Sequence, residues 1–202
     1  MRCILIFFIF FSTSEAKFLY NEDNSMIEWI GRKLTGQHTG NINPSQVNLD
    51  IFSRTDNTLS ISGTITMDMN TISNIDIKSE ESRGYLVGHL KSDDFFDVEN
   101  YPYAYLEIID CIRLDETKIS DKHNYIITGK LMIKGISHQI EIPTFIEAVK
   151  IRDLYYVTAD GSISIDRTLY NIKYKSKNYF PDIGDKLIYD DFTINFQIHG
   201  TY

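Results

Sequence analysis

The residues most able to do chemistry gather in the stretch HLKSDDFFDVENYP, from His89 to Pro102. An imidazole followed by the carboxylates of Asp93 and Asp94 could act as an acid–base pair or hold a metal ion. A structural role fits better, because Ser92 is a favourable helix N-cap and acids in a first turn complement the helix dipole. We therefore predict a short helical insertion near residues 80–100, with a helix that starts at Ser92 and ends before Pro102, and no catalytic role for its acids.

Elsewhere the chain lacks the usual catalytic and metal-binding motifs. Its 5 histidines are scattered, and it contains no HExxH, no CxxC, no glycine-rich phosphate loop and no nucleophile elbow. The formal net charge of -8 disfavours both nucleic acid and an anionic membrane surface as partners of the chain as a whole. These patterns predict neither an enzyme nor a bound metal or cofactor.

The elements that position these residues are predicted to be strands. Apolar and polar residues alternate over 45–52, 59–69, 155–165 and 188–198, and further strands are expected at 26–30, 74–79, 103–110, 125–134 and 138–142. Alternation indicates one buried and one wet face, which is typical of antiparallel sheet. Eight or nine such strands predict a barrel or a sandwich, and glycines inside several strands favour the curvature of a barrel.

The N-terminus is expected to be a secretory signal peptide. Arg2 precedes an apolar run over 3–11, and Ser14 and Ala16 supply the small residues that a signal peptidase reads. The run is too short to cross a membrane, and no later segment is long and apolar enough. We predict that residues 1–16 are removed, that 17–202 form a single domain, and that the protein is periplasmic or extracellular. Cys111 is then the one remaining cysteine, so no internal disulfide is expected.

Four blocks carry a resemblance to a known family: HTG at 38–40, GHLKSDDFFDVENYP at 88–102, ITGKLMIKGISHQIEIP at 127–143 and IDRTLYNIKY at 165–174. Their order and spacing resemble the YceI-like family from roughly residue 24 to 200. One departure is Asn171, which stands near a glycine of many members. The resemblance implies an all-β fold, namely an eight-stranded antiparallel lipocalin-like barrel with an internal tunnel and a helical insertion. It also implies an exported bacterial protein, an isoprenoid-like ligand and a homodimer.

The predicted function is therefore binding of an isoprenoid or other long apolar chain inside the barrel, for sequestration or transport without catalysis. The residues expected to line the tunnel or its mouth are His38, Val47, Leu49, Ile61, Ile65, Met67, Leu86, His89, Phe95, Phe96, Tyr103, Tyr105, Ile163, Arg167, Phe192 and Phe196. Inward apolar faces would also suit a filled core, so the pattern alone leaves tunnel and core open.

The sequence also leaves two alternative functions open. His38 and His89 lie in the matching blocks, and with Asp93 or Asp94 they could serve a metal-dependent or acid–base enzyme. A barrel that mainly binds a partner protein is a third possibility.

Arg167 and the tyrosines Tyr103 and Tyr105 each allow two interpretations. Arg167 follows a strand, where it could pair with a carboxylate or pyrophosphate headgroup, or with a local acid such as Asp160 or Asp166. Tyr103 and Tyr105 share a strand face, and their hydroxyls could meet the wetter end of a tunnel, although plain strand packing explains them equally well.

Overall fold

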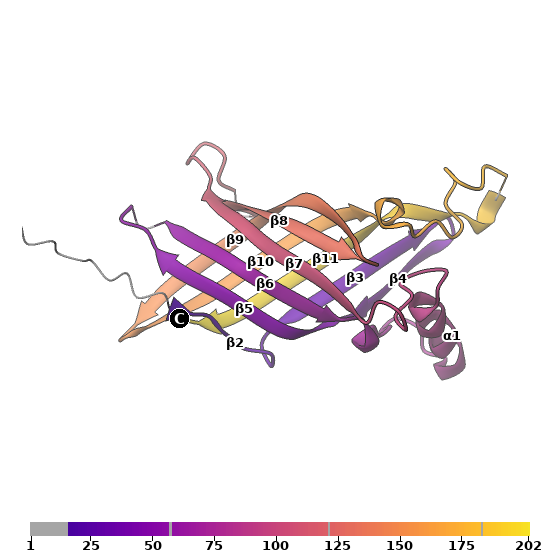
Figure 1. Ribbon diagram of the computed structural model, residues 1–202, viewed down its shortest axis with the longest axis horizontal. Helices are drawn as coiled ribbons and strands as arrows, with labels where there is room; N and C mark the ends of the chain where they lie inside the picture. Colours follow the sequence, from indigo (N-terminus) through magenta and orange to yellow (C-terminus); the bar gives the residue numbers. More distant parts are fainter. Residues whose placement is uncertain (1–15, 57, 121, 183) are drawn as a thin grey trace, which may run out of the picture.

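The chain folds into one antiparallel sheet of eleven strands that curls into an elongated barrel (Figure 1). The computed structural model describes residues 16–56, 58–120, 122–182 and 184–202, so the expected signal peptide lies outside the described residues except for Ala16. The strands are β1 (Ala16–Lys17), β2 (Leu19–Tyr20), β3 (Met26–Lys33), β4 (Gly36–Asn41), β5 (Asn43–Ser53), β6 (Leu59–Asp68), β7 (Tyr103–Arg113), β8 (Tyr125–Ile133), β9 (Ile136–Ile151), β10 (Leu154–Asp166) and β11 (Ile188–Thr201).

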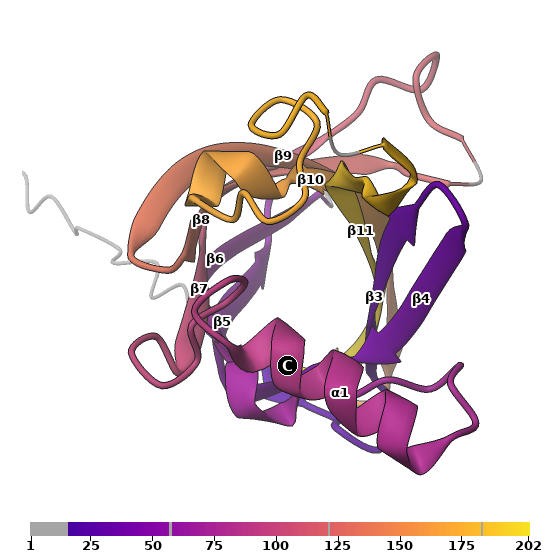
Figure 2. The same cartoon turned by 90° about the vertical axis from the view of Figure 1, so that its right-hand side faces the viewer.

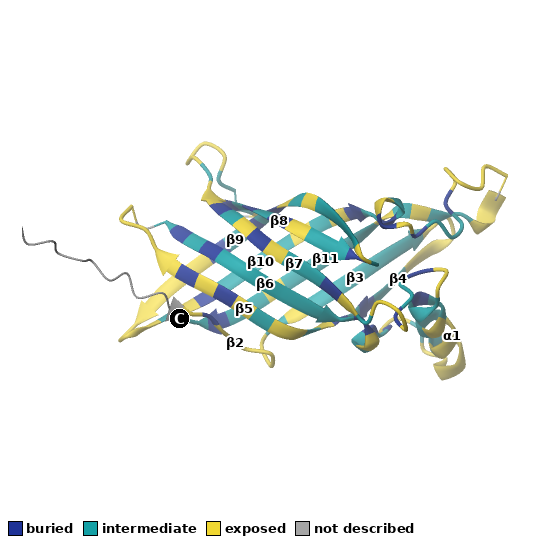
Figure 3. Ribbon diagram, viewed as in Figure 1, coloured by how far each residue is buried: buried dark blue, intermediate teal, exposed yellow. Residues whose placement is uncertain are grey.

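Strand alternation produces the barrel, as the sequence predicted. On β10, Val157 and Ile165 are buried, whereas Ser162 and Ser164 of the opposite row are exposed. Figure 3 shows buried and exposed residues alternating along several strands. Gly161 belongs to the inward row of β10, and a Cβ at this position would overlap the ring of Phe196 on β11. The glycine therefore lets a large neighbour fill the interior without disturbing the register of the ladder.

Five residues at the start of the described chain close the barrel. The hydrogen-bonded order runs from β5 through β6, β7, β8, β9, β10 and β11 to β3 and β4. Lys17 of β1 pairs with Asp50 of β5, whereas Leu19 of β2 pairs with Thr201 of β11. Between them, the N–H of Phe18 donates to a β5 carbonyl over 2.9 Å, and the Phe18 side chain is only 4% exposed. The segment thus links two strands that are otherwise separated by a seam.

The helical insertion lies where it was expected, but its helix starts earlier. Helix α1 (Glu80–Lys91) begins after Ser79, whose hydroxyl accepts a hydrogen bond from the N–H of Ser82. Ser92 is the C-cap, and its N–H and hydroxyl both donate to the carbonyl of His89. The prediction of a helix start at Ser92 is therefore wrong. Ser79 followed by two glutamates supplies the same capping chemistry one helix length earlier.

The predicted strand at 74–79 is also wrong, and the strand β4 was not foreseen. The side chain of Asn74 takes the place of backbone hydrogen bonds between strands here. Its amide N–H donates to the carbonyl of Thr39, and its amide oxygen accepts from the N–H of Ile77. The eight expected strands become eleven because β1, β2 and β4 add short pairings to the edges.

Short 3₁₀-helices complete the fold: η1 (Met69–Thr71), η2 (Arg167–Tyr170) and η3 (Gly184–Lys186). Within the described part of the chain, no helix combines the length and the apolarity that crossing a membrane requires.

Candidate ligand-binding cavity

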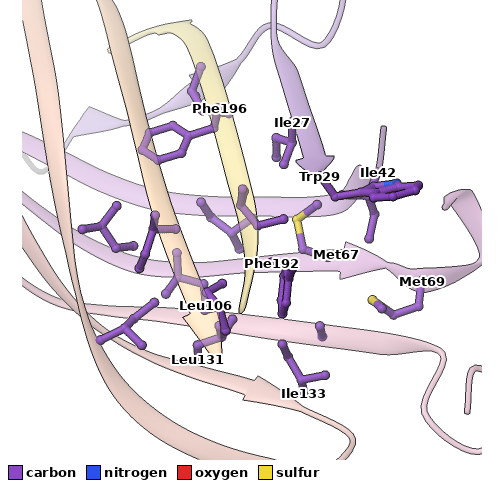
Figure 4. A pocket seen from close by; sticks show the side chains of 18 of the residues that line it. Ile27, Trp29, Ile42, Met67, Met69, Leu106, Leu131, Ile133, Phe192 and Phe196 are labelled. Atoms are coloured by element: carbon purple, nitrogen blue, oxygen red, sulfur yellow. The ribbon is translucent and has the colours of Figure 1, made fainter. Parts of the chain in front are cut away.

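The barrel encloses a cavity of about 260 Å³ that runs along its interior (Figure 4). It extends from Phe18 at the seam to Leu90 and Phe95 beside α1. Side chains from β3 and from β5 to β11 point into it, among them Trp29, Met67, Leu106, Leu131 and Phe192. The interior is therefore a tunnel-like space and not a filled core.

The chemistry of the wall is almost entirely that of hydrocarbon. Isoleucine, leucine, methionine, phenylalanine and alanine make up most of it, with the indole of Trp29 among them. The indole N–H is already satisfied, because it donates to the carbonyl of Ser73 over 3.0 Å. A wall with so few free polar groups favours an apolar molecule over water or a polar metabolite.

The cavity opens at the end of the barrel that carries α1; Figure 2 views the molecule from this end. Two of its lining residues are exposed, and both of them, Tyr189 and Asp191, stand at the start of β11. The opposite end is closed by a buried layer that includes Cys111, Tyr125 and Leu59. The Tyr125 hydroxyl accepts a hydrogen bond from the N–H of Leu59 over 3.2 Å, which ties this layer together.

Arg167 holds the backbone of the mouth. Its guanidinium is only 3% exposed and donates to the carbonyls of Ile172 (2.8 Å), Ile188 (3.1 Å) and Tyr189 (3.1 Å). Its acidic partner is Asp190, at 3.3 Å, and not one of the two acids expected from the sequence.

This burial lowers the pKa of Arg167, while the negative charges of Asp190 and Asp166 oppose the shift. Although Arg167 borders the cavity, these internal acceptors occupy most of its donors, which favours the local ion pair over a headgroup partner.

Arg32 also borders the cavity, but its side chain serves the outer surface. Its guanidinium donates to the hydroxyl of Thr193 over 2.9 Å. Thr193 lies between Phe192 and Ile194, which both line the cavity, so its own side chain faces outward. Arg32 therefore contributes no charge to the interior.

The structure sorts the sixteen predicted site residues into two groups. Ten border the cavity: Leu49, Ile61, Ile65, Met67, Phe95, Phe96, Ile163, Arg167, Phe192 and Phe196. Six do not: His38, Val47, Leu86, His89, Tyr103 and Tyr105. Val47 and Leu86 still pack against the apolar clusters that surround the cavity. A role in ligand binding stays a prediction for all ten wall residues.

Tyr103 and Tyr105 lie outside the barrel, so their predicted placement in the tunnel is wrong. On β7 the inward residues are Ala104, Leu106 and Ile108, and side chains of adjacent strand residues point to opposite faces. The two tyrosine rings pack against each other with centroids 6.4 Å apart. Strand packing, the alternative left open by the sequence, accounts for both.

The two candidate histidines have separate partners. On β4, the Nδ1 of His38 lies 2.9 Å from a carboxylate oxygen of Asp76. Burial alone would raise the pKa of Asp76, but the N–H of Thr39, the His38 ring and a neighbouring amide together lower it. His89, on α1, instead packs edge-on against aromatic rings, with centroids 4.5 Å from Tyr174 and 5.1 Å from Phe95.

Among the residues that the structure describes, no group of three or more His, Cys, Asp or Glu side chains could hold a metal ion. The imidazoles of His38 and His89 therefore contribute no common metal site within this part of the chain.

The barrel described above has known relatives. The YceI-like domain matches residues 18–200. The chain belongs to the YceI-like family. No curated protein matches it.

Solved structures show the same YceI-like fold at low sequence identity. BcnA of Burkholderia cenocepacia has a TM-score of 0.64 at 17% identity, covering 89% of this chain and 98% of that one. The YCEI protein of Campylobacter jejuni has a TM-score of 0.56 at 17% identity, covering 80% and 84%. A polyisoprenoid binding domain from Saccharophagus degradans has a TM-score of 0.56 at 12% identity, covering 93% and 98%.

Several wall residues of this YceI-like barrel were missed from the sequence. They include Trp29 and Ile42 near the mouth, Leu106 on β7, Leu131 on β8 and Leu90 on α1. Alternation carries a usable signal for the strand residues, since Ile27 and Trp29 share the inward face of β3. Leu90 carries a weaker signal, because it is the one buried residue of α1 and only Leu86, four residues earlier, extends its apolar face.

Proposed function

We propose that this YceI-like protein binds one elongated apolar molecule, such as an isoprenoid chain, inside the barrel. The observation that carries the proposal is the apolar cavity of about 260 Å³ that runs from Phe18 to Phe95 and opens beside Tyr189. Its likeness in fold to a polyisoprenoid binding domain supports the same class of ligand. Eight-stranded barrels are known hosts for single small ligands.

The energetics suit a hydrocarbon chain. Each buried methylene contributes about 0.8 kcal/mol, so one five-carbon isoprene unit contributes about 4 kcal/mol before the costs of immobilising the chain. A polar head has no charged partner deep in the wall, because the donors of Arg167 are used internally. We therefore place the tail in the cavity and any polar head at the open end, near Tyr189 and Asp191.

The proposed mode of action is sequestration or transport, with no bond made or broken. The competing proposal of an acid–base or metal-dependent enzyme rested on His38 and His89. The contacts of these two residues, an aspartate for one and aromatic rings for the other, give it no specific support.

Export is part of the proposal. We propose that residues 1–16 are a signal peptide and that the mature chain starts near Lys17. The buried ring of Phe18 supports a start that leaves this residue in place. N-terminal sequencing of protein recovered outside the cytoplasm tests it, and an intact Met1 there would reject it. A homodimer also remains a proposal, which analytical ultracentrifugation of the purified protein tests.

Native mass spectrometry with organic extraction tests the binding function. Protein purified from its own host should carry a reproducible apolar molecule, and the stripped protein should regain mass when an isoprenoid is added. A protein that is ligand-free as isolated and also ignores added isoprenoids would reject the proposal.

A further inference from the structure

We propose that the loop at the cavity mouth docks on the surface of an anionic membrane. The loop is formed by residues Lys173–Phe180 and is called the mouth loop below. The inference rests on the proposed function, because docking there would let an apolar ligand pass between the cavity and a bilayer. It adds a membrane-binding site, which ligand binding alone does not require.

The mouth loop is fixed directly beside the opening. The N–H of Ile188, at the start of β11, donates to the carbonyl of Lys175 over 3.0 Å. The amide of Asn178 donates to Asp190 over 2.8 Å, and Asp190 in turn pairs with buried Arg167. The exposed cavity residue Tyr189 lies between these two anchor points. The loop therefore borders the route by which a ligand enters or leaves.

Its composition matches the chemistry of an anionic lipid surface. The sequence KYKSKNYF places Lys173, Lys175 and Lys177 at alternate positions in a chain whose formal net charge is -8. Acids return only after the loop, with Asp182 and Asp185. Tyr179 and Phe180 are 47% and 50% exposed at its end. Basic residues with adjacent exposed aromatics are the combination that binds the interface of an anionic bilayer.

Two of the three lysines, Lys173 and Lys175, lie over aromatic rings. The Nζ of Lys173 lies 4.7 Å from the centroid of Tyr179, and the Nζ of Lys175 lies 4.9 Å from that of Tyr174. Exposed leucines occur at the same end of the barrel, at Leu34 between β3 and β4 and at Leu169 on η2. Seen from this end, η2, the mouth loop and the β3–β4 turn stand around the barrel opening (Figure 2).

The opposite end of the barrel is a matched comparison. There the hairpin of β9 and β10 exposes Val149 and Tyr156, which pair across the strands and are 57% and 47% exposed. The cavity is closed at that end by the layer around Tyr125. Apolar exposure occurs at both ends, so the open mouth and the three lysines together single out the mouth loop.

Co-sedimentation with vesicles tests the proposal on the full mature chain. Vesicles of equal parts phosphatidylglycerol and phosphatidylcholine are compared with vesicles of phosphatidylcholine alone. Each basic side chain near an anionic surface strengthens binding about fivefold. We expect the variant K173Q/K175Q/K177Q to bind anionic vesicles about a hundredfold more weakly and to lose the dependence on salt. The variant Y179S/F180S should bind at least about tenfold more weakly.

The control variant V149S/Y156S should bind vesicles like the parent. The proposal is overturned if the parent shows no preference for anionic vesicles, or if the control weakens binding as much as Y179S/F180S does. Unchanged vesicle binding by the lysine variant also overturns it, because the membrane contact then lies outside the lysines of the mouth loop.

A second measurement separates this inference from the proposed function. A fluorescent prenyl probe is titrated into parent and variants without vesicles, and all should bind it equally because the changes lie outside the cavity. If the parent ignores the probe but still binds anionic vesicles, the proposed function fails and the docking surface stands. If probe binding is intact and vesicle binding is absent, the docking inference alone fails.

Discussion

Narrowing the cavity from within should weaken ligand binding strongly and leave the fold intact. Ala159 on β10 lines the cavity between Val157 and Ile163, and it faces inward beside Ile146 and Ile198 of the flanking strands. The substitution Ala159→Phe places a ring in the ligand's path. Because the space already exists, the new ring need not displace the wall.

The size of the effect follows from the carbons exchanged. The substitution adds six carbons to the wall, and if they exclude as many carbons of the ligand at about 0.8 kcal/mol each, about 5 kcal/mol of gross binding energy is lost. Each 1.4 kcal/mol corresponds to about a tenfold change in Kd, and some of the chain can relocate toward the mouth. We therefore expect Kd to rise by about a hundredfold or more.

Titration of a fluorescent prenyl probe measures Kd, and urea denaturation measures stability. The free energy of unfolding should fall by no more than about 1–3 kcal/mol, the usual cost of overpacking. Thr158→Phe is the matched control, because Thr158 is the next residue on β10 and faces outward beside Glu147 and His199. Near-parental Kd in A159F, or an equal loss in T158F, would refute ligand binding in this cavity.

Three further predictions concern the parts of the fold that frame the cavity. Phe18→Ala should lower the free energy of unfolding by about 3–5 kcal/mol in urea denaturation, because it empties the closing seam, whereas Leu19→Ala at the exposed neighbour should have little effect. Arg167→Met should cost about 3–5 kcal/mol by the same measurement, because it leaves three carbonyls in the interior without their donor and the partly exposed Asp190 without its cation; a loss below about 1 kcal/mol would contradict this account. Burial raises the pKa of the Cys111 thiol to about 12, so a thiol-reactive dye should label it in urea but not in the native protein at neutral pH; rapid native labelling would show that the closed end opens.

Strand prediction succeeded where one face of the sheet is apolar and the other is polar. On the second half of β11 every second residue from Phe192 to Ile198 enters the cavity wall, and on β10 Val157, Ala159, Ile163 and Ile165 do, so the sequence itself displays the geometry. The strand β7 was also predicted correctly, but its inward face was not, because Tyr103 and Tyr105 alternate with smaller apolar residues. Both rows of β7 are apolar there, and a bulge near Ile108 shifts the register, so periodicity alone does not decide which row faces inward.

The predicted start of α1 was wrong for a different reason. On α1 only Leu90 is buried, and Leu86 packs partly against the same cluster, so the apolar stripe is short and the caps carry most of the sequence signal. Ser79 and Ser92 are each followed by two acidic residues, so both match the pattern of a helix N-cap, and the sequence does not decide between them. β4 was missed because GQHTGN has no large apolar side chain. Its Gly40 is required by packing, since a Cβ there would overlap the carbonyl of Ser73.

The meeting of β2 with β11 has a consequence for the order in which the molecule can form. Leu19 pairs with Thr201, so the barrel joins the beginning of the described chain to its end. A ribosome must therefore release the last strand before the cylinder can close, and contacts of such high sequence separation form slowly. Before β11 is available, the sheet is incomplete and has two free edges. A polypeptide in this state can still pass through a narrow opening as an extended chain. Topology thus delays completion of the barrel until β11 has been synthesised.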